Sequence, residues 1–291
     1  MLRFTTLTPP VLLLTLLFIS GHGIPAEITD APPNDRRPPS ANESARGRSY
    51  ETRATDKTVH AHHQPLCQIS PGCRQPARDL LLHKSLNSTV DNLLGDFSGI
   101  SEERRKKLDH LANIISGQRS AGQTVELVFI CTHNSRRSHM SQLWAAAAAA
   151  FFGVSQIITY SGGTEVSAFN HQAVAALQRA GFSIAPISPA LQPSLHNPHY
   201  QVSFSPDRPA ITVFSKKYDA PVNPEKDFVA VMTCDHANNT CPAIAGASFR
   251  IALPWADPKE ADNTPEAASR YDERVRQIGS EMLYLFARVS G

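Results

Sequence analysis

The chain has 291 residues, which is enough for one large domain or two small ones. Its apolar content of 41% is ordinary for a globular protein and allows a sizeable core. A formal net charge of +2 gives no argument for a nucleic-acid partner, so none is expected. The 22 prolines and 12 histidines are many, and a large share of them precede residue 80, so the composition changes along the chain.

Residues 1–26 resemble a secretory signal peptide. Arg3 precedes an apolar run at 11–19, and Gly23 and Ala26 offer small residues at which a signal is cleaved. The apolar run is too short to cross a membrane as a standard helix, so no stable membrane insertion is expected. A translation start placed too far upstream is the alternative interpretation, and the sequence favours neither.

Residues 27–78 are rich in Pro, Arg, Ser, Asn and His and carry almost no periodic apolar residues. They predict a disordered linker. Thiols and imidazoles cluster within it at His60, His62, His63, Cys67 and Cys73. Their spacing fits no closed zinc site well, so no metal is predicted. A Cys67–Cys73 disulfide is the other interpretation if this segment is exported.

Two helices are predicted next. The first is expected from Leu80 to Leu94. The second begins after Ser101, a good N-cap, and is expected to end at Gly117. One apolar stripe runs along it, formed by Leu108, Leu111, Ile114 and Ile115. Its other face, Arg104–Lys107, is interpreted as a solvated charged surface.

The most informative stretch of the chain is residues 125–138. Leu127–Ile130 is a short, β-rich apolar run, as expected for a strand buried on both faces. Met140–Phe152 has high helix propensity. A loop between such a strand and helix aims backbone N–H groups and the positive end of the helix dipole at one point. Cys131 lies at the mouth of that loop, where its thiolate is favoured, and Arg137 can donate two hydrogen bonds to a tetrahedral oxyanion.

Cysteine, five residues, arginine and serine is a pattern typical of oxyanion-binding cysteine enzymes. The bare pattern is only moderately specific, because a buried structural cysteine beside a surface arginine has the same spacing. The predicted strand before Cys131 and the predicted helix after Ser138 favour the functional interpretation.

Strands and helices alternate beyond that point. Residues 156–160 predict a second strand, followed by a loop at 161–164 and a helix that Gly181 ends. Apolar positions of that helix are Ala173, Val174, Leu177 and Ala180. Residues 185–208 are proline-rich and are expected to be irregular, with Tyr200, Val202 and Phe204 alternating.

Ile211–Phe214 and Phe228–Met232 predict a third and a fourth strand, and the last helix is expected to begin with Thr264 as N-cap and Pro265 at its first position. This order predicts an α/β domain at 79–291 with its core at 124–288. In a mainly parallel sheet the ligand lies beyond the carboxyl ends of the strands, where Cys131 and Cys234 both fall.

A second cysteine cluster lies in the polar stretch 234–242. Cys234 and Cys241 bring the thiols of the folded domain to three, an odd number that argues against a disulfide scaffold. A zinc site lacks a paired partner motif, so a thiol relay is favoured, in which each cysteine attacks a neighbouring sulfur in turn. Asp257, before Pro258, can donate a proton to a leaving oxygen, although a turn former before proline is the alternative.

Together these residues resemble the low-molecular-weight tyrosine phosphatase fold and, within it, the thioredoxin-coupled arsenate reductases. The resemblance covers about residues 124–288 and is thinnest at 185–225. It implies a three-layer α/β fold with a mainly parallel four-stranded sheet, to which this chain adds N-terminal helices. It also implies an oxyanion loop of Thr132, His133, Asn134, Ser135, Arg136 and Arg137.

The resemblance assigns a role to each catalytic residue. Cys131 would be the nucleophile, Asn134 would shape the loop, and Ser138 would donate a hydrogen bond to the thiolate. Cys234 and Cys241 match the spacing of the reductase's two relay cysteines, and Asp257-Pro258 matches its aspartate-proline pair. Two motifs at the right separation are far more specific than either motif alone.

The chain also departs from the family. His133 stands where glycine is usual, and Arg136 stands where a cysteine is frequent. Phosphatases of this fold usually place an aromatic residue after the aspartate-proline pair, whereas Lys259 and Glu260 follow here. This favours a small oxyanion over a phosphotyrosine ring.

The sequence therefore predicts an arsenate reductase that binds an arsenate- or phosphate-type oxyanion, holds no cofactor and depends on thioredoxin or a similar thiol as external reductant. A phosphomonoesterase that uses Cys131, Arg137 and Asp257 is the first alternative. A non-catalytic oxyanion-binding domain, in which His133 and Arg136 have ended turnover, is the second. Thiol chemistry favours the cytoplasm, in opposition to the apparent signal peptide.

Overall fold

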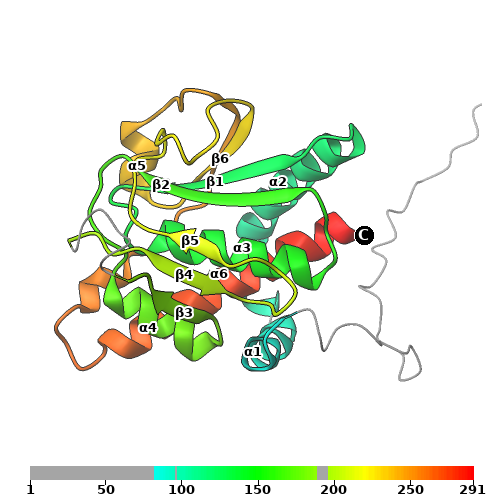
Figure 1. The fold of residues 1–291 in the computed structure, drawn as a ribbon. Coiled ribbons are helices and arrows are strands. Elements are labelled where there is room, and N and C mark those ends of the chain that lie inside the picture. The colour runs from blue at the N-terminus through cyan, green and yellow to red at the C-terminus, as the bar shows by residue number, and fades with distance from the viewer. Residues whose placement is uncertain (1–81, 96, 189–195) are drawn as a thin grey trace, which may run out of the picture. The chain divides into compact units, whose positions relative to one another are not determined.

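A computed structural model of the protein describes residues 82–95, 97–188 and 196–291 (Figure 1). The predicted signal peptide, the predicted linker and the cluster between His60 and Cys73 lie outside these residues. Within the described part of the chain, no helix has the length and apolarity needed to cross a bilayer.

A four-stranded parallel sheet forms the centre of the fold, in the order β2-β1-β6-β7. Its strands are β1 (Val125–Cys131), β2 (Ile157–Gly163), β6 (Phe228–Met232) and β7 (Ala247–Ala252). The central strands β1 and β6 are buried along almost their whole length, because both faces of the sheet are covered. The expected α/β architecture with a mainly parallel four-stranded sheet is confirmed.

The identity of the fourth strand corrects the prediction. Ile211–Phe214 was expected to complete the main sheet, but β5 (Ile211–Val213) belongs to a second, antiparallel sheet with β3 (Ser183–Pro186) and β4 (Tyr200–Ser203). The stretch 185–208, expected to be irregular, therefore contains β4 and the last two residues of β3. β7 forms the edge of the main sheet, in the place expected for Ile211–Phe214. Its alternation is weak, because Phe249 is exposed and Arg250 is half-buried.

Alternate residues of the central strands face two different layers. Leu127, Phe129 and Val231 pack against the larger helical layer. It contains α3 (Arg137–Phe151), α4 (His171–Ala180) and α6 (Ala267–Ser290). Val128 and Met232 face the smaller layer, where Ala237 of α5 (Asp235–Thr240) packs. The carboxyl ends of β1 and β6 thus open beside both α3 and α5 (Figure 1).

Helix ends differ from the sequence prediction at three places. The first helix was expected from Leu80, but Leu82 and His83 are not helical and α1 begins at Lys84. Gly117 was expected to end α2 (Glu102–Ser120), but it lies inside that helix. Thr264 was expected to cap the last helix, but its hydroxyl donates to the carbonyl of Ala261, and α6 begins at Ala267. The Gly181 cap of α4 is confirmed by its left-handed φ of 108°.

Among the described residues, three elements precede the sheet: α1 (Lys84–Leu94), the short 3-10 helix η2 (Phe97–Gly99) and α2. Ser101 caps α2 as expected, its side chain accepting a hydrogen bond from the Arg104 amide. Leu86, Leu108 and Leu111 are fully buried in the cluster that also contains α6. The expected N-terminal helices are therefore part of the main core.

Candidate functional site

The predicted oxyanion loop, residues 131–137, is called the anion loop below. It connects the end of β1 to the first turn of α3. Its carbonyls accept hydrogen bonds from the segments around it: Cys131 from the Thr164 amide, Thr132 from the Glu165 amide, and Ser135 from the Asn170 amide. Because a peptide N–H points opposite to its C=O, this arrangement turns several loop amides inward, as an anion-binding nest requires.

Gly163 makes this packing possible. It pairs with Cys131 in the parallel register of β1 and β2. A Cβ added at Gly163 would lie 2.6 Å from the carbonyl oxygen of Thr132 and 2.7 Å from the amide nitrogen of Asn134. Only a residue without a side chain fits at this close approach.

Cys131 lies at the base of the anion loop, 4% exposed, with its Sγ 3.1 Å from Ser138 Oγ. Asn134 Nδ2 donates to the same hydroxyl oxygen at 2.8 Å. Asn134 Oδ1 in turn accepts from the Lys216 amide at 2.9 Å, which fixes the orientation of the side-chain amide. Because Ser138 Oγ already accepts from Asn134, it can donate its own proton toward the Cys131 sulfur.

Arg137 and Asp257 meet at the other side of the anion loop. Arg137 donates to Asp257 Oδ2 at 2.6 Å and to the Trp255 carbonyl at 2.9 Å. A guanidinium has five N–H donors, so others remain for an oxyanion. Asp257 Oδ1 accepts from the Lys259 amide and caps a 3-10 turn that begins at Pro258. The two interpretations of Asp257, turn former and acid, are therefore compatible.

Arg136 was predicted to bind the oxyanion but points elsewhere. It donates to the Tyr271 hydroxyl at 2.6 Å and forms an ion pair with Asp262 at 2.9 Å. Burial acts to lower the pKa of Arg136, but the Tyr271 hydrogen bond and the charges of Tyr271, Asp257 and Asp262 together raise it. The Arg136 side chain therefore connects the anion loop to Tyr271 of α6 and to Asp262.

His133 also points outward. Its side chain is about half exposed and lies 3.2 Å from a carboxylate oxygen of Glu165. Its carbonyl, in contrast, is held by the hydroxyls of Ser167 and Ser215. The backbone of His133 therefore belongs to the loop scaffold, while its imidazole lines an open pocket of about 480 Å³ next to the loop.

The second cysteine cluster lies beside the anion loop, through Cys234. Cys234 lies at the carboxyl end of β6, is buried, and has its Sγ 3.5 Å from Thr132 Oγ1. It also caps α5, accepting a hydrogen bond from the Ala237 amide. Cys241 follows the last residue of α5 and is partly exposed. All three cysteines in the described part of the chain are free thiols.

Two residues near the site were missed by sequence reasoning. The Lys216 amide orients Asn134, and burial lowers the pKa of the Lys216 side chain to about 8. Arg104, interpreted as solvated, is 13% exposed and forms an ion pair with Glu281 at 2.7 Å. Neither lies in a recognisable motif, so only the tertiary contacts identify them. Among the described residues, no group of His, Cys, Asp and Glu is arranged to hold a metal.

No family model matches the chain. A curated arsenate reductase of Halalkalibacterium halodurans is 26% identical over 161 residues, which are 55% of this chain and 94% of that relative. The chain resembles arsenate reductases of the low-molecular-weight phosphatase fold. The resemblance expected from the sequence is thus confirmed.

Solved structures of two kinds are similar to this chain. One is a low-molecular-weight phosphotyrosine phosphatase from Vibrio cholerae, at 13% identity, 55% coverage of this chain, 94% coverage of that chain and a TM-score of 0.36. The other is a thioredoxin-dependent arsenate reductase from Corynebacterium glutamicum, at 14% identity, 68% and 96% coverage, and a TM-score of 0.31.

Proposed function

We propose that this protein is an arsenate reductase with a cysteine relay. The observation that carries the proposal is the position of Cys234, whose sulfur lies against Thr132 of the anion loop. A phosphatase needs only Cys131, Arg137 and Asp257. A second buried thiol beside the nucleophile's loop is what a reduction requires, because two electrons must come from sulfur.

In the first step, Cys131 would attack arsenic as a thiolate and form an S–As bond. One oxygen leaves as water, taking a proton that Asp257 supplies. Loop amides and Arg137 would hold the remaining oxygens. Cys234 would then attack the Cys131 sulfur: an S–S bond forms, the S–As bond breaks, and its electron pair stays on arsenic, which leaves as arsenite.

Cys241 would next attack Cys234, releasing Cys131 as a thiol and leaving a Cys234–Cys241 disulfide for an external dithiol of the thioredoxin class. These two residues flank α5. A helical rise of about 1.5 Å per residue places their Cα atoms roughly 10 Å apart, beyond the limit of about 7 Å for a disulfide. The relay therefore requires α5 to unwind, which a six-residue helix can do at small cost.

The same chemistry needs reduced thiols between turnovers. A reducing compartment supplies them, and we propose that the enzyme works in the cytoplasm.

A phosphomonoesterase is the second candidate, favoured by one observation. The pocket of about 480 Å³ beside the anion loop is lined by Tyr200, whose partly exposed ring offers aromatic surface to an aryl group. This function would use Cys131, Arg137 and Asp257 and would leave Cys234 and Cys241 without a part in turnover.

Coupled kinetics distinguish the two. Arsenate-dependent NADPH consumption with thioredoxin and thioredoxin reductase would be followed for the wild type and for Cys131→Ser, Cys234→Ser and Cys241→Ser, with aryl phosphate hydrolysis in parallel. The matched control is a Cys67→Ser/Cys73→Ser double variant, which removes the two other thiols of the sequence. Loss of arsenate turnover in all three single variants, but not in the control, is expected.

Multiple turnovers of arsenate in Cys234→Ser or Cys241→Ser would contradict the relay. Aryl phosphate hydrolysis alone, unaffected by Cys241→Ser, would establish the phosphatase. Phosphate binding without either activity would indicate the non-catalytic anion-binding domain.

A further inference from the structure

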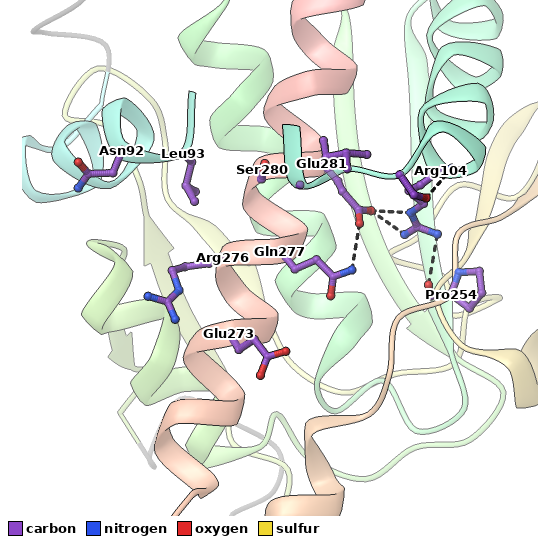
Figure 2. A pocket seen from close by; sticks show the side chains of 12 residues that line it. Asn92, Leu93, Arg104, Pro254, Glu273, Arg276, Gln277, Ser280 and Glu281 are labelled. Carbon is purple, nitrogen blue, oxygen red and sulfur yellow. Dashed lines mark hydrogen bonds and ion pairs between the residues drawn. The ribbon is translucent and has the colours of Figure 1, made fainter. Parts of the chain in front are cut away.

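Arg104 of α2 lies in a dense polar network on the far side of the Asp257 segment. Its guanidinium donates to Glu281 Oε2 of α6 at 2.7 Å, and Trp255 Nε1 donates to the same oxygen at 3.0 Å. Gln277 donates to the other oxygen of Glu281 at 3.2 Å. Figure 2 shows the side chains of Arg104, Gln277 and Glu281 converging beside a pocket of about 730 Å³.

Arg104 also holds the backbone that leads to Asp257. It donates to the carbonyl of Pro254 at 3.2 Å and to that of Leu253 at 3.4 Å. Its guanidinium carbon lies 4.6 Å from the centre of the Trp255 ring. One side chain thus contacts three consecutive residues of the segment, through their carbonyls or through the indole.

The opposite side of the same segment carries the reaction groups. The Trp255 carbonyl accepts from Arg137, and Asp257 follows two residues later with its carboxylate on Arg137. The segment 253–257 is therefore fixed between two arginines. Arg104 holds it from the helical layer, and Arg137 holds it from the anion loop.

The network is buried enough to be rigid. Arg104 is 13% exposed and Glu281 is 3% exposed, so the ion pair is little screened by solvent. A forked guanidinium with several charge-assisted hydrogen bonds fixes geometry more closely than a flexible ammonium does. A displacement of about 1 Å in an acid group is enough to cost about 100-fold in rate.

We infer that Arg104 is a positioning residue for the general acid, holding the 253–257 segment so that Asp257 and Arg137 meet at the anion loop. This inference rests on the proposed function for the role of Asp257. It also gives the N-terminal helices, which lie outside the stretch that carries the family resemblance, a part in the active site.

The test uses the full chain and an Arg104→Lys variant. Lysine keeps the charge opposite Glu281 but loses the fork that reaches the carbonyls of Leu253 and Pro254 and the stacking on Trp255. The matched control is Arg105→Lys, because Arg105 neighbours Arg104 on α2 but donates to the Phe97 carbonyl and not to the 253–257 segment. Steady-state arsenate reduction and peptide-resolved hydrogen exchange would be measured for each.

For Arg104→Lys we expect kcat to fall by about 10-fold or more, with KM for arsenate changed by less than about twofold, because the acid and not the anion loop is displaced. Backbone amides in peptides that cover 253–262 should exchange faster, while those of 131–138 keep their protection. Arg105→Lys should leave both readouts at wild-type values.

The Asp257→Asn background separates positioning from a general loss of stability. If Arg104 acts through Asp257, then Arg104→Lys should cause no further fall in kcat once Asp257 is replaced. Independent, multiplicative losses would overturn the inference, and so would unchanged exchange of the 253–262 peptides. If the wild type reduces no arsenate, the proposed function fails, whereas the exchange data still decide whether Arg104 holds the segment.

Discussion

Asn134 shows how single side chains shape the anion loop. Its φ of 44° lies in the left-handed region, which asparagine tolerates better than most residues. In this conformation its side chain bridges the Lys216 amide and the Ser138 hydroxyl. The residue that bends the loop therefore also organises the donor that faces Cys131.

Lys216, whose amide donates to Asn134, is buried, and this burial makes the stability of the protein depend on pH. Its side chain is 7% exposed and its pKa falls from 10.5 to about 8 because burial disfavours the charged form. Between pH 8 and 10.5 the unfolded chain holds more protons at this site than the folded chain. The free energy of unfolding therefore rises with pH across this window.

A Lys216→Met variant removes this contribution. At pH 7 it should be more stable than the wild type by about 2 kcal/mol, since about 3 kcal/mol of desolvation is relieved and about 1 kcal/mol of contact with the Phe214 ring is lost. That advantage should shrink as the pH approaches 10. Urea unfolding at pH 7, 8.5 and 10 measures it.

The matched control is Lys217→Met, because Lys217 is exposed. It should show no pH-dependent difference from the wild type. His139 and His199, whose pKa values are lowered by burial and then by the charge of Lys216, titrate below this window. A stability difference that stays constant from pH 7 to 10 would contradict the burial argument.

The sequence predicts which side chains lie close together only where one local backbone unit places them there. Cys131, Asn134 and Ser138 are close because one strand-loop-helix unit carries them, and that unit is readable from the sequence. Arg136 and Arg104 are different. Long side chains choose among distant partners, here Asp262 and Glu281, and no local pattern indicates which. The catalytic roles of all these residues stay predictions.

At the scale of elements, two glycines of the core domain should respond in opposite ways to alanine. Gly163→Ala places a methyl group against backbone atoms of Thr132, Asn134 and Glu165, none of which can shift without moving the anion loop. We expect a loss of stability of about 1–3 kcal/mol and a loss of phosphate binding. Thermal unfolding and calorimetric titration with phosphate measure the two effects.

Gly117 provides the contrast. It lies inside α2, and an added Cβ would meet nothing within 4 Å. Gly117→Ala should raise stability by about 0.5–1 kcal/mol through helix propensity and leave phosphate binding unchanged. Normal phosphate binding by Gly163→Ala would show that the close approach at β2 does not shape the loop. A loss of stability in Gly117→Ala would contradict the argument from helix propensity.

Strands could be predicted where the pattern of apolar residues matches the pattern of burial in the fold. Leu127–Ile130 of β1 and Phe228–Met232 of β6 are uninterrupted apolar runs, so both strands were identified from the sequence. The run of β5 was also identified, but the sequence does not state which sheet a strand joins. β7 was missed because an edge strand with Ser248, Phe249 and Arg250 exposed or half-buried has no clear alternation.

At the scale of the whole molecule, the N-terminal helices complete the core. Leu86, Val90, Leu108, Leu111 and Ile115 are fully buried, in the same cluster as the residues of α3 and α6. At about 2 kcal/mol for each buried side chain, they contribute roughly 10 kcal/mol, which is as large as the net stability of a typical domain.

A chain beginning at residue 122 should therefore fail to fold cooperatively, although it contains the stretch that carries the family resemblance. Without α1 and α2, the apolar face of α6 is exposed and Glu281 loses its ion-pair partner Arg104. We expect binding of a hydrophobic dye, loss of near-UV circular dichroism and no sharp thermal transition. A chain beginning at residue 82 should unfold in one transition, and Arg104→Lys in that chain separates loss of the ion pair from loss of the apolar contacts. Cooperative unfolding of the shorter chain at an unchanged midpoint would show that the α/β core is self-sufficient and that the N-terminal helices only cover it.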